Sequence, residues 1–174
     1  MIEPGFSSAV NSNSCSTARV LSDEGRSAAT DPHKWDPQTR ETADHSIPFV
    51  VACALHFGSV YVEHFDEEVL LDPELLELMD KIEVHLDPEC EAAWPNATLN
   101  IVTVEMTEGH RHTVGTPHYL GHFRRPMSDG DIEDKFRRLT QNLLAPKQQE
   151  EAVEIIWDLE NVEDIGKVFG KLLV

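Results

Sequence analysis

The sequence predicts an α+β protein with a small antiparallel or mixed sheet, helices packed against it, and further helices at the C-terminal end. Three observations lead to this prediction. The central part of the chain alternates apolar and polar residues with the period of two that is typical of strands. Segments before and after it repeat apolar residues every three or four positions, as amphipathic helices do. The predicted strands and helices are grouped along the chain, whereas a parallel α/β fold alternates them strictly.

The first predicted elements are a buried helix, a short helix and a strand. Residues 47–57 are apolar on nearly every face, Pro48 suits a first helical turn, and Gly58 suits a left-handed C-terminal cap. Asp72-Pro73-Glu74 has the residue types of an N-cap and an acidic first turn, so a short helix should begin there and end near residue 80. A half-buried strand should follow at residues 82–86. The residues expected to point inward from the short helix and the strand are Leu75, Leu76, Leu78, Met79, Ile82, Val84 and Leu86.

A hairpin and three helices complete the predicted order. Residues 99–106 are β-branched and apolar, and Glu108-Gly109 should turn them toward a partner strand at residues 110–116. Ser128 should cap the first of the three helices, and Ala145-Pro146 should begin the second. The apolar residues expected along these helices are Ile132, Phe136, Leu139 and Leu143, then Val153, Ile156 and Trp157, and finally Ile165, Val168, Phe169, Leu172 and Leu173.

The domain organisation follows from a change in composition near residue 30. Residues 1–30 are rich in Ser, Asn, Gly and Ala and have few periodic apolar residues, so we expect a disordered tail there. Residues 31–144 should form the α+β domain. Residues 145–174 should form a separate group of C-terminal helices.

The composition excludes several classes of function. Among 174 residues there are 14 Lys+Arg and 32 Asp+Glu, which gives a formal charge of −18 and argues against a general nucleic-acid binder. No apolar run approaches the ~20 residues that cross a bilayer, so we expect no membrane protein. The three cysteines form no C-x-x-C pair, which argues against a disulfide framework and a zinc knuckle. We therefore expect a reducing compartment, the cytoplasm, with a mitochondrial location as the alternative.

The histidines raise the question of a metal site. His110, His112, His118 and His122 lie close in the sequence, and alternate residues of a strand share one face. However, no cysteine or carboxylate stands at a spacing that would complete a set of ligands. The sequence therefore predicts no metal site.

The segment that leads into the buried helix is the stronger candidate for chemistry, because it contains Lys34, Arg40, Asp44 and His45. A histidine at the mouth of a buried helix can act as an acid or a base near neutral pH. The spacing alone leaves an alternative open. In that alternative, Asp44 or Ser46 merely caps the helix and His45 is a half-buried surface residue.

Two separated motifs resemble those of a known family. T-R-E-T-A-D-H-S-I-P-F at residues 39–49, preceded by D-P-H-K-W-D-P at residues 31–37, resembles the start of the second domain of the MmgE/PrpD family, and more narrowly of its 2-methylcitrate dehydratase branch. G-H-F-R-R-P-M-S at residues 121–128, followed by Lys135-Phe136, resembles a later loop and helix of that family. The resemblance covers residues 31–174. It implies an α+β second domain and C-terminal helices that pack on a large helical first domain, which this chain lacks.

The resemblance also implies a function for the candidate residues. Enzymes of this kind dehydrate a citrate-type tricarboxylate without a cofactor. His45, with Asp44 beside it, is then the catalytic contribution of this domain, acting as either the acid or the base. Lys34 and Ser46 would bind the substrate, together with Arg40, whose role is inferred from its spacing alone.

The resemblance is compatible with several functions. The same family includes alkylcitrate dehydratases, cis-aconitate decarboxylases and an epimerase, and the residues that separate them lie largely outside this chain. A different class of function is a non-catalytic, truncated homologue that acts as an association module. Because a partner domain is missing, we expect the isolated chain to be inactive or nearly so. We also expect exposed apolar surface on the helix from residue 47 and around Phe169, covered by a homodimer partner or by a helical domain.

Overall fold

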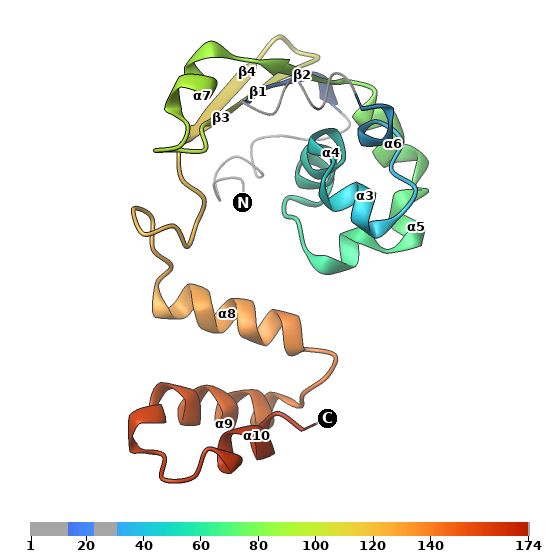
Figure 1. Ribbon diagram of the computed structural model, residues 1–174. Coiled ribbons are helices and arrows are strands. Elements are labelled where there is room, and N and C mark those ends of the chain that lie inside the picture. The colour runs from blue at the N-terminus through green and yellow to red at the C-terminus, as the bar shows by residue number, and fades with distance from the viewer. Residues whose placement is uncertain (1–13, 23–30, 174) are drawn as a thin grey trace. The chain divides into compact units, whose positions relative to one another are not determined.

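The structure, a computed structural model, describes residues 14–22 and 31–173 (Figure 1). The chain divides into two compact units between Leu120 and Gly121. The boundary that the sequence suggested between residues 144 and 145 therefore lies inside the second unit. No helix in the described ranges is both long enough and apolar enough to cross a membrane.

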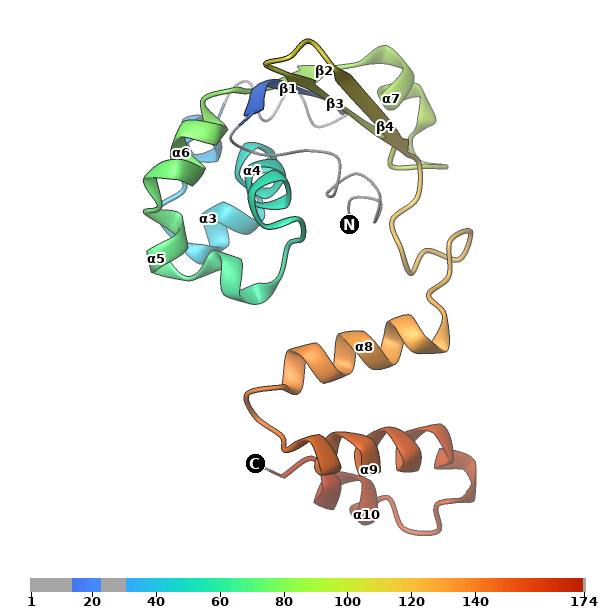
Figure 2. The same cartoon turned by 180° about the vertical axis from the view of Figure 1, so that it is seen from behind.

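A four-stranded mixed sheet forms one layer of the first unit, in the order β2-β1-β3-β4. β1 runs parallel to β2 and antiparallel to β3, and β3 forms the predicted hairpin with β4 (Figures 1 and 2). This confirms the α+β class and its mixed form. The strands are β1 (Cys15–Ser22), β2 (Ile82–Leu86), β3 (Asn100–Met106) and β4 (Arg111–Thr116).

β1 corrects the prediction of a disordered tail over residues 1–30. Residues 15–22 form a central strand, and Val20 pairs with a residue of β2 on one side and of β3 on the other. The inner face of β1 consists mostly of small residues, because Cys15, Ala18 and Ser22 are buried together with Val20. Small buried residues give a strand little hydropathy, so the sequence pattern did not reveal it. The rest of the predicted tail, residues 1–13 and 23–30, lies outside the described residues.

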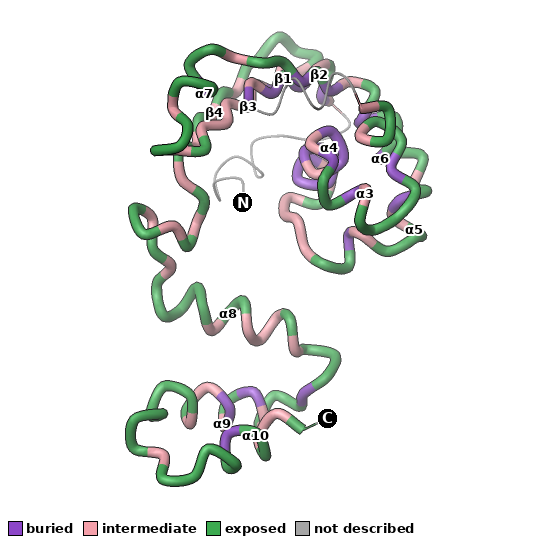
Figure 3. The backbone as a smooth tube through the Cα atoms, in the orientation of Figure 1, coloured by how far each residue is buried: buried purple, intermediate pink, exposed green. Residues whose placement is uncertain are grey.

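Helix α4 (Ile47–Phe57) lies on one face of the sheet and is the most buried helix of the first unit (Figure 3). Ser46 caps its N-terminus, Pro48 lies in the first turn, and Gly58 ends it with a φ of 74°, as the sequence predicted. Most of its residues are buried within the first unit, so the apolar surface that we expected on this helix is limited to the exposed Phe57 and the half-buried Ile47 and Val50. The other helical segments of this unit are η2 (Pro32–Lys34), α3 (Arg40–Asp44), η3 (Val62–Phe65), α5 (Glu67–Leu70), α6 (Pro73–Met79) and α7 (Pro88–Ala93).

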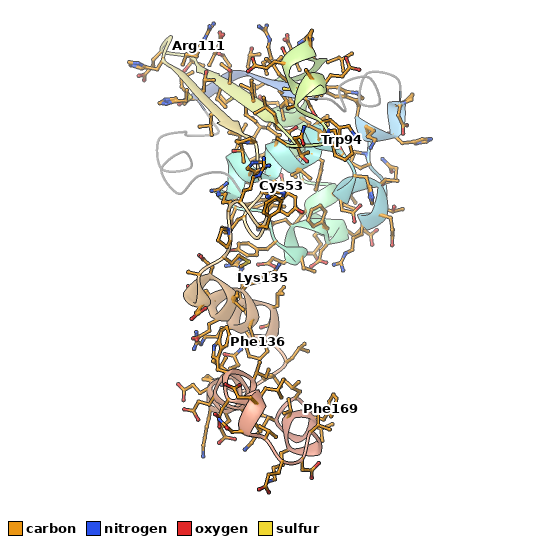
Figure 4. The ribbon with its side chains drawn as sticks, turned by 60° about the vertical axis from the view of Figure 1, so that its left-hand side comes forward. Cys53, Trp94, Arg111, Lys135, Phe136 and Phe169 are labelled. Carbon is orange, nitrogen blue, oxygen red and sulfur yellow. The ribbon has the colours of Figure 1, made fainter. Side chains whose placement is uncertain are left out.

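The hydrophobic core of this unit lies between α4, α6 and the sheet. Phe49, Cys53, Leu75 and Val104 each expose 0% of their surface, and Cys53 marks the position of α4 in Figure 4. Two residues that we expected to point inward do not, because Leu76 on α6 and Leu86 at the end of β2 are exposed; the others of that set are buried.

The second unit consists of helices joined by short loops. Gln149 of α9 (Pro146–Trp157) is buried, and its side-chain amide donates hydrogen bonds to the carbonyl of Arg137 and the hydroxyl of Thr140. These bonds connect α9 to α8 (Asp129–Thr140). Phe136 lies on α8 and Phe169 on α10 (Figure 4), and Phe169 is largely exposed, as predicted. The helical segments are α8 (Asp129–Thr140), α9 (Pro146–Trp157), η4 (Leu159–Asn161) and α10 (Gly166–Lys171).

Candidate functional site

The first unit contains a cavity of about 510 Å³ between α4 and the sheet. It forms here because α4 packs mainly against β2 and α6, which leaves the inner face of β3 and β4 less covered. All of its described lining residues belong to the first unit. They are Val20, Lys34, Asp44, His45, Ser46, Ile47, Val50, Val51, Thr98, Asn100, Val102, Val114, Thr116 and Tyr119.

The floor of the cavity is a row of three valines from three neighbouring strands. Val20 of β1 is paired with Val102 of β3, which is paired in turn with Val114 of β4. Side chains on paired residues of adjacent strands project to the same face, so these three stand side by side. One step along the same face, Asn100 pairs with Thr116, and both line the cavity. The floor therefore changes from aliphatic to polar.

The facing wall comes from the first turns of α4. Ile47, Val50 and Val51 lie at i, i+3 and i+4 and so share one face of the helix. This places three aliphatic side chains opposite the three valines of the floor.

The polar rim lies at the junction between α3 and α4. Thr39 caps α3, whose last residue is Asp44, and Ser46 caps α4, so His45 is held between two helix ends. The 3-10 turn η2 brings Lys34 to the same junction. Four of the five predicted site residues thus line the cavity, and their closeness follows from the two caps.

His45 is fixed through its Nδ1 atom. Nδ1 is hydrogen-bonded to the Asp44 carboxylate and lies 3.0 Å from the carbonyl oxygen of Glu41. The bond to the Asp44 carboxylate is the main reason why the pKa of His45 is raised above its ordinary value, with the Glu41 carbonyl second. The stabilisation from this pair is therefore present below the ordinary histidine pKa and is lost as the pH rises through the raised one. The side chain is 77% exposed, so the imidazole stands at the rim of the cavity, not inside it.

Hydrogen bonds of Lys34 and Ser46 connect the turn η2 to the start of α4. The Nζ atom of Lys34 donates a hydrogen bond of 2.6 Å to the carbonyl oxygen of His45. The Ser46 hydroxyl donates to the carbonyl oxygen of Lys34 and accepts the N–H of Phe49 at 3.1 Å. Ser46 is fully buried and caps α4. This is the role that the alternative interpretation of the sequence gave to Ser46. The ammonium group of Lys34 has three N–H donors, and the bond to His45 uses one of them.

Arg40 is the predicted site residue that the structure does not bring to the cavity. Its guanidinium forms an ion pair with Asp66, and it is absent from the described lining. Arg40 is the first residue of α3 and Asp44 is the last, so the two lie on different parts of that short helix. A spacing of five residues could not show on which side of the helix the guanidinium would find its carboxylate.

Sequence reasoning did not identify the residues that line the far side of the cavity, which are Thr98, Asn100, Thr116 and Tyr119. Strand alternation does place Asn100 on the face of Val102, and Thr116 on the face of Val114. It does not show that the two strands pair in the register that sets Asn100 beside Thr116.

The structure also gives the surroundings of the remaining histidines. Among the described residues, no three His, Cys, Asp or Glu side chains gather in a way that could hold a metal ion. His112 lies on β4, and His122 takes part in an isolated bridge with Arg125.

Comparisons with known proteins identify one family model and several relatives that match this chain. The family model described as the MmgE/PrpD C-terminal domain matches residues 16–161. Human cis-aconitate decarboxylase is 29% identical over 128 residues, which cover 74% of this chain and 26% of that protein. The 2-methylcitrate dehydratase of Escherichia coli K12 is 30% identical over 129 residues, covering 70% of this chain and 26% of that enzyme. The chain thus spans about a quarter of the length of these relatives. The match begins within β1, so the likeness starts earlier than the residue 31 that the motifs suggested.

Proposed function

The chain belongs to the MmgE/PrpD family, and on this premise we propose that it supplies one wall of a site at which a citrate-type tricarboxylate loses water, as in 2-methylcitrate dehydratase. The observation that carries the proposal is the cavity whose rim joins the imidazole of His45 to the ammonium group of Lys34. A carboxylate-rich substrate needs cations, and a dehydration needs a group that can move a proton near neutral pH.

The geometry suggests a division of roles within this proposal. With Nδ1 engaged by Asp44, the free atom of the His45 ring is Nε2. In the proposed reaction, Nε2 exchanges the proton: it takes the hydrogen next to a carboxylate, or it gives one to the departing hydroxyl, which leaves as water. Asp44 is a positioning residue that holds the tautomer and stabilises the imidazolium. Lys34 would bind a substrate carboxylate with the N–H donors that His45 does not use.

The overall charge makes a local cationic site necessary. At −18 the protein repels a trianion at long range. Salt screens that repulsion beyond roughly 8 Å at physiological ionic strength, whereas Lys34 and a protonated His45 act at contact distance. The raised pKa of His45 favours the charged imidazole that such a ligand would need.

We further propose that turnover requires groups beyond those of this chain. A dehydration uses both an acid and a base, and His45 is the sole imidazole among the described lining residues. The relatives are about four times as long as the matched segment, so the remaining groups would come from polypeptide outside it. A helical domain or a second copy would also cover the apolar side chains of the second unit, such as Phe169 at 63% exposure and Leu173 at 70%.

Calorimetric titration of 2-methylcitrate into the full chain tests the proposal. Lys34→Gln and His45→Gln should each weaken binding at least tenfold, since a hydrogen bond to a charged group contributes ~1.5–3 kcal/mol. Arg40→Gln is the matched control, because it removes a cation of the same segment that lies outside the cavity. Absence of binding, or equal loss in Arg40→Gln, would contradict the assignment. Robust dehydration by the chain alone would contradict the proposed need for further groups.

A second candidate substrate is cis-aconitate. It deserves a parallel titration because the similarity to cis-aconitate decarboxylase covers 74% of this chain, against 70% for 2-methylcitrate dehydratase. cis-Aconitate lacks the hydroxyl and the methyl group of 2-methylcitrate, and it contains a carbon–carbon double bond. Release of carbon dioxide from cis-aconitate would favour decarboxylation, whereas tighter binding alone would not, because dehydration of a citrate also forms an unsaturated tricarboxylate.

A further inference from the structure

We propose that Asn100 and Thr116 form a second binding subsite, on the sheet side of the cavity, which holds one terminal carboxylate of the substrate. This inference rests on the proposed function, because that function supplies the tricarboxylate. It goes beyond the proposed function by giving a binding role to two residues of the sheet and by naming the substrate group that they hold. In this arrangement, Lys34 and His45 bind the other carboxylates at the rim.

The register of the β3–β4 hairpin brings the two residues together. Asn100 is the first residue of β3 and Thr116 is the last residue of β4, and the two are paired. Side chains of paired residues project to the same face with their Cβ atoms about 4.5–5.5 Å apart, so both can reach one carboxylate. Both residues are half-buried and line the cavity, which leaves their polar groups accessible to a ligand.

Both side chains have hydrogen-bond donors available for a ligand. In the part of the chain that the structure describes, the Thr116 hydroxyl forms no hydrogen bond. Nδ2 of Asn100 donates to the carbonyl oxygen of Thr98 at 3.2 Å, which leaves its second N–H unused by that bond. The hydroxyl and the amide can therefore each donate to one oxygen of the same carboxylate, and hydrogen bonds to an ionised acceptor are the stronger kind.

The backbone holds this pair in place from both sides. On one side Val102 pairs with Val114, and on the other the N–H of Thr98 donates to the carbonyl oxygen of Pro117 at 3.0 Å. The bond from Asn100 to the Thr98 carbonyl also fixes the orientation of the amide. The donors are thus ordered before a ligand binds, which lowers the entropic cost of binding.

The distribution of charge in the cavity favours a carboxylate at this pair. Among the described lining residues, the cationic groups are Lys34 and His45, and both lie at the junction of α3 and α4. A tricarboxylate has one carboxylate more than these two residues can each bind. Asp44 is the sole acidic residue of the described lining, and its carboxylate is hydrogen-bonded to His45. A carboxylate at the sheet therefore meets neutral donors and no like charge among the described lining residues there.

A calorimetric series on the full chain tests the role of the pair. The ligands are citrate, tricarballylate, which lacks only the hydroxyl of citrate, and citramalate, which has a methyl group in place of one terminal carboxymethyl arm. Thr116→Val should weaken the binding of citrate and of tricarballylate about tenfold, as expected for the loss of one hydrogen bond to a charged group. The binding of citramalate should stay nearly unchanged, because both of its carboxylates can bind at the rim.

Matched variants separate the effect of the hydroxyl from an effect on the fold. Thr116→Ser keeps the hydroxyl and should bind citrate as the wild type does. Thr113→Val removes a hydroxyl from the opposite face of β4, where Thr113 is hydrogen-bonded to Thr103 at 3.0 Å and is absent from the described lining, so it should not change binding. Asn100→Leu removes the other donor and should act like Thr116→Val. Thermal melts establish that each variant is folded, and either folded variant is sufficient for the test.

The outcomes separate this inference from the proposed function. If Lys34→Gln weakens citrate binding but Thr116→Val and Asn100→Leu do not, the subsite is refuted and the proposed function stands. If these two variants weaken citramalate as much as citrate, the pair does not hold the terminal carboxylate and the assignment is overturned. An effect that is lost with tricarballylate would assign the pair to the substrate hydroxyl instead. If the wild type binds none of the ligands, the proposed function fails and the inference fails with it.

Discussion

Replacing Ser46 by alanine should destabilise the first unit by about 2–3 kcal/mol without weakening ligand binding in the folded protein. The sequence predicts Ser46 as a substrate-binding residue, but Ser46 is fully buried. Its hydroxyl already donates one hydrogen bond and accepts another within the protein. It accepts the N–H of Phe49 at 3.1 Å and donates to the carbonyl oxygen of Lys34. Ser46→Ala removes both bonds.

The magnitude follows from these two losses. Removal of an N-cap serine costs ~1 kcal/mol, within a range of about 0.5–2. The bond to the Lys34 carbonyl adds ~1 kcal/mol, and more where the N–H of Phe49 is left buried without a partner. Asp72→Ala is the matched control: Asp72 caps α6 through a bond of 2.9 Å to the N–H of Glu74, but at a less buried site. That variant should lose only about 1 kcal/mol.

Urea denaturation followed by tryptophan fluorescence gives both values. Because the chain forms two compact units, the measurement is best made in a Trp157→Phe background, which leaves Trp35 and Trp94 as reporters of the first unit. The affinity for 2-methylcitrate is then measured by calorimetry in the absence of urea. If Ser46→Ala is no less stable than Asp72→Ala but binds 2-methylcitrate much more weakly, the hydroxyl is a ligand group and the reasoning fails.

Four other predictions follow from the same structure. Asp44→Asn should lower the raised pKa of His45, visible as a lower midpoint in an NMR titration of its imidazole; an unchanged midpoint would refute the role of the carboxylate. Gly58→Ala should cost ~1–2 kcal/mol in urea denaturation, because its φ is 74°. Burial raises the pKa of the Cys53 thiol to about 12, so Cys53 should resist alkylation at pH 8 until the protein is denatured, as mass spectrometry would show. A chain that begins at Asp31 lacks β1 and should show no cooperative unfolding of the sheet by circular dichroism.

The parts of the fold that the sequence predicted are those determined by nearby residues. Helix α4 was predictable with its bounds, because Ser46, Pro48 and Gly58 mark its ends and the residues between them are apolar. The β3–β4 hairpin was predictable because Gly109 turns one β-branched run toward the next. In both cases the information lies within about a dozen residues.

The parts that were missed depend on distant residues. β1 is stabilised by pairing with residues of β2 more than sixty positions later and with residues of β3 at least eighty positions later, and its own inward residues are mostly small. The valine row exists only once three strands have come into register, so no local pattern could indicate it. The assignment of Arg40 to the site was wrong for the same reason, because its ion-pair partner Asp66 lies just before α5 and far from Arg40 in the sequence.

The rim of the cavity shows how structural and proposed functional roles divide among neighbouring atoms. The Ser46 hydroxyl and one N–H of Lys34 are used to join the turn η2 to the start of α4. Nδ1 of His45 is used by Asp44. What these contacts leave is Nε2 of the imidazole and the other donors of Lys34, at a fixed separation because the same contacts hold both residues. The junction that ends one helix and begins the next thereby holds an imidazole beside an ammonium group, which is the arrangement that the proposed function requires.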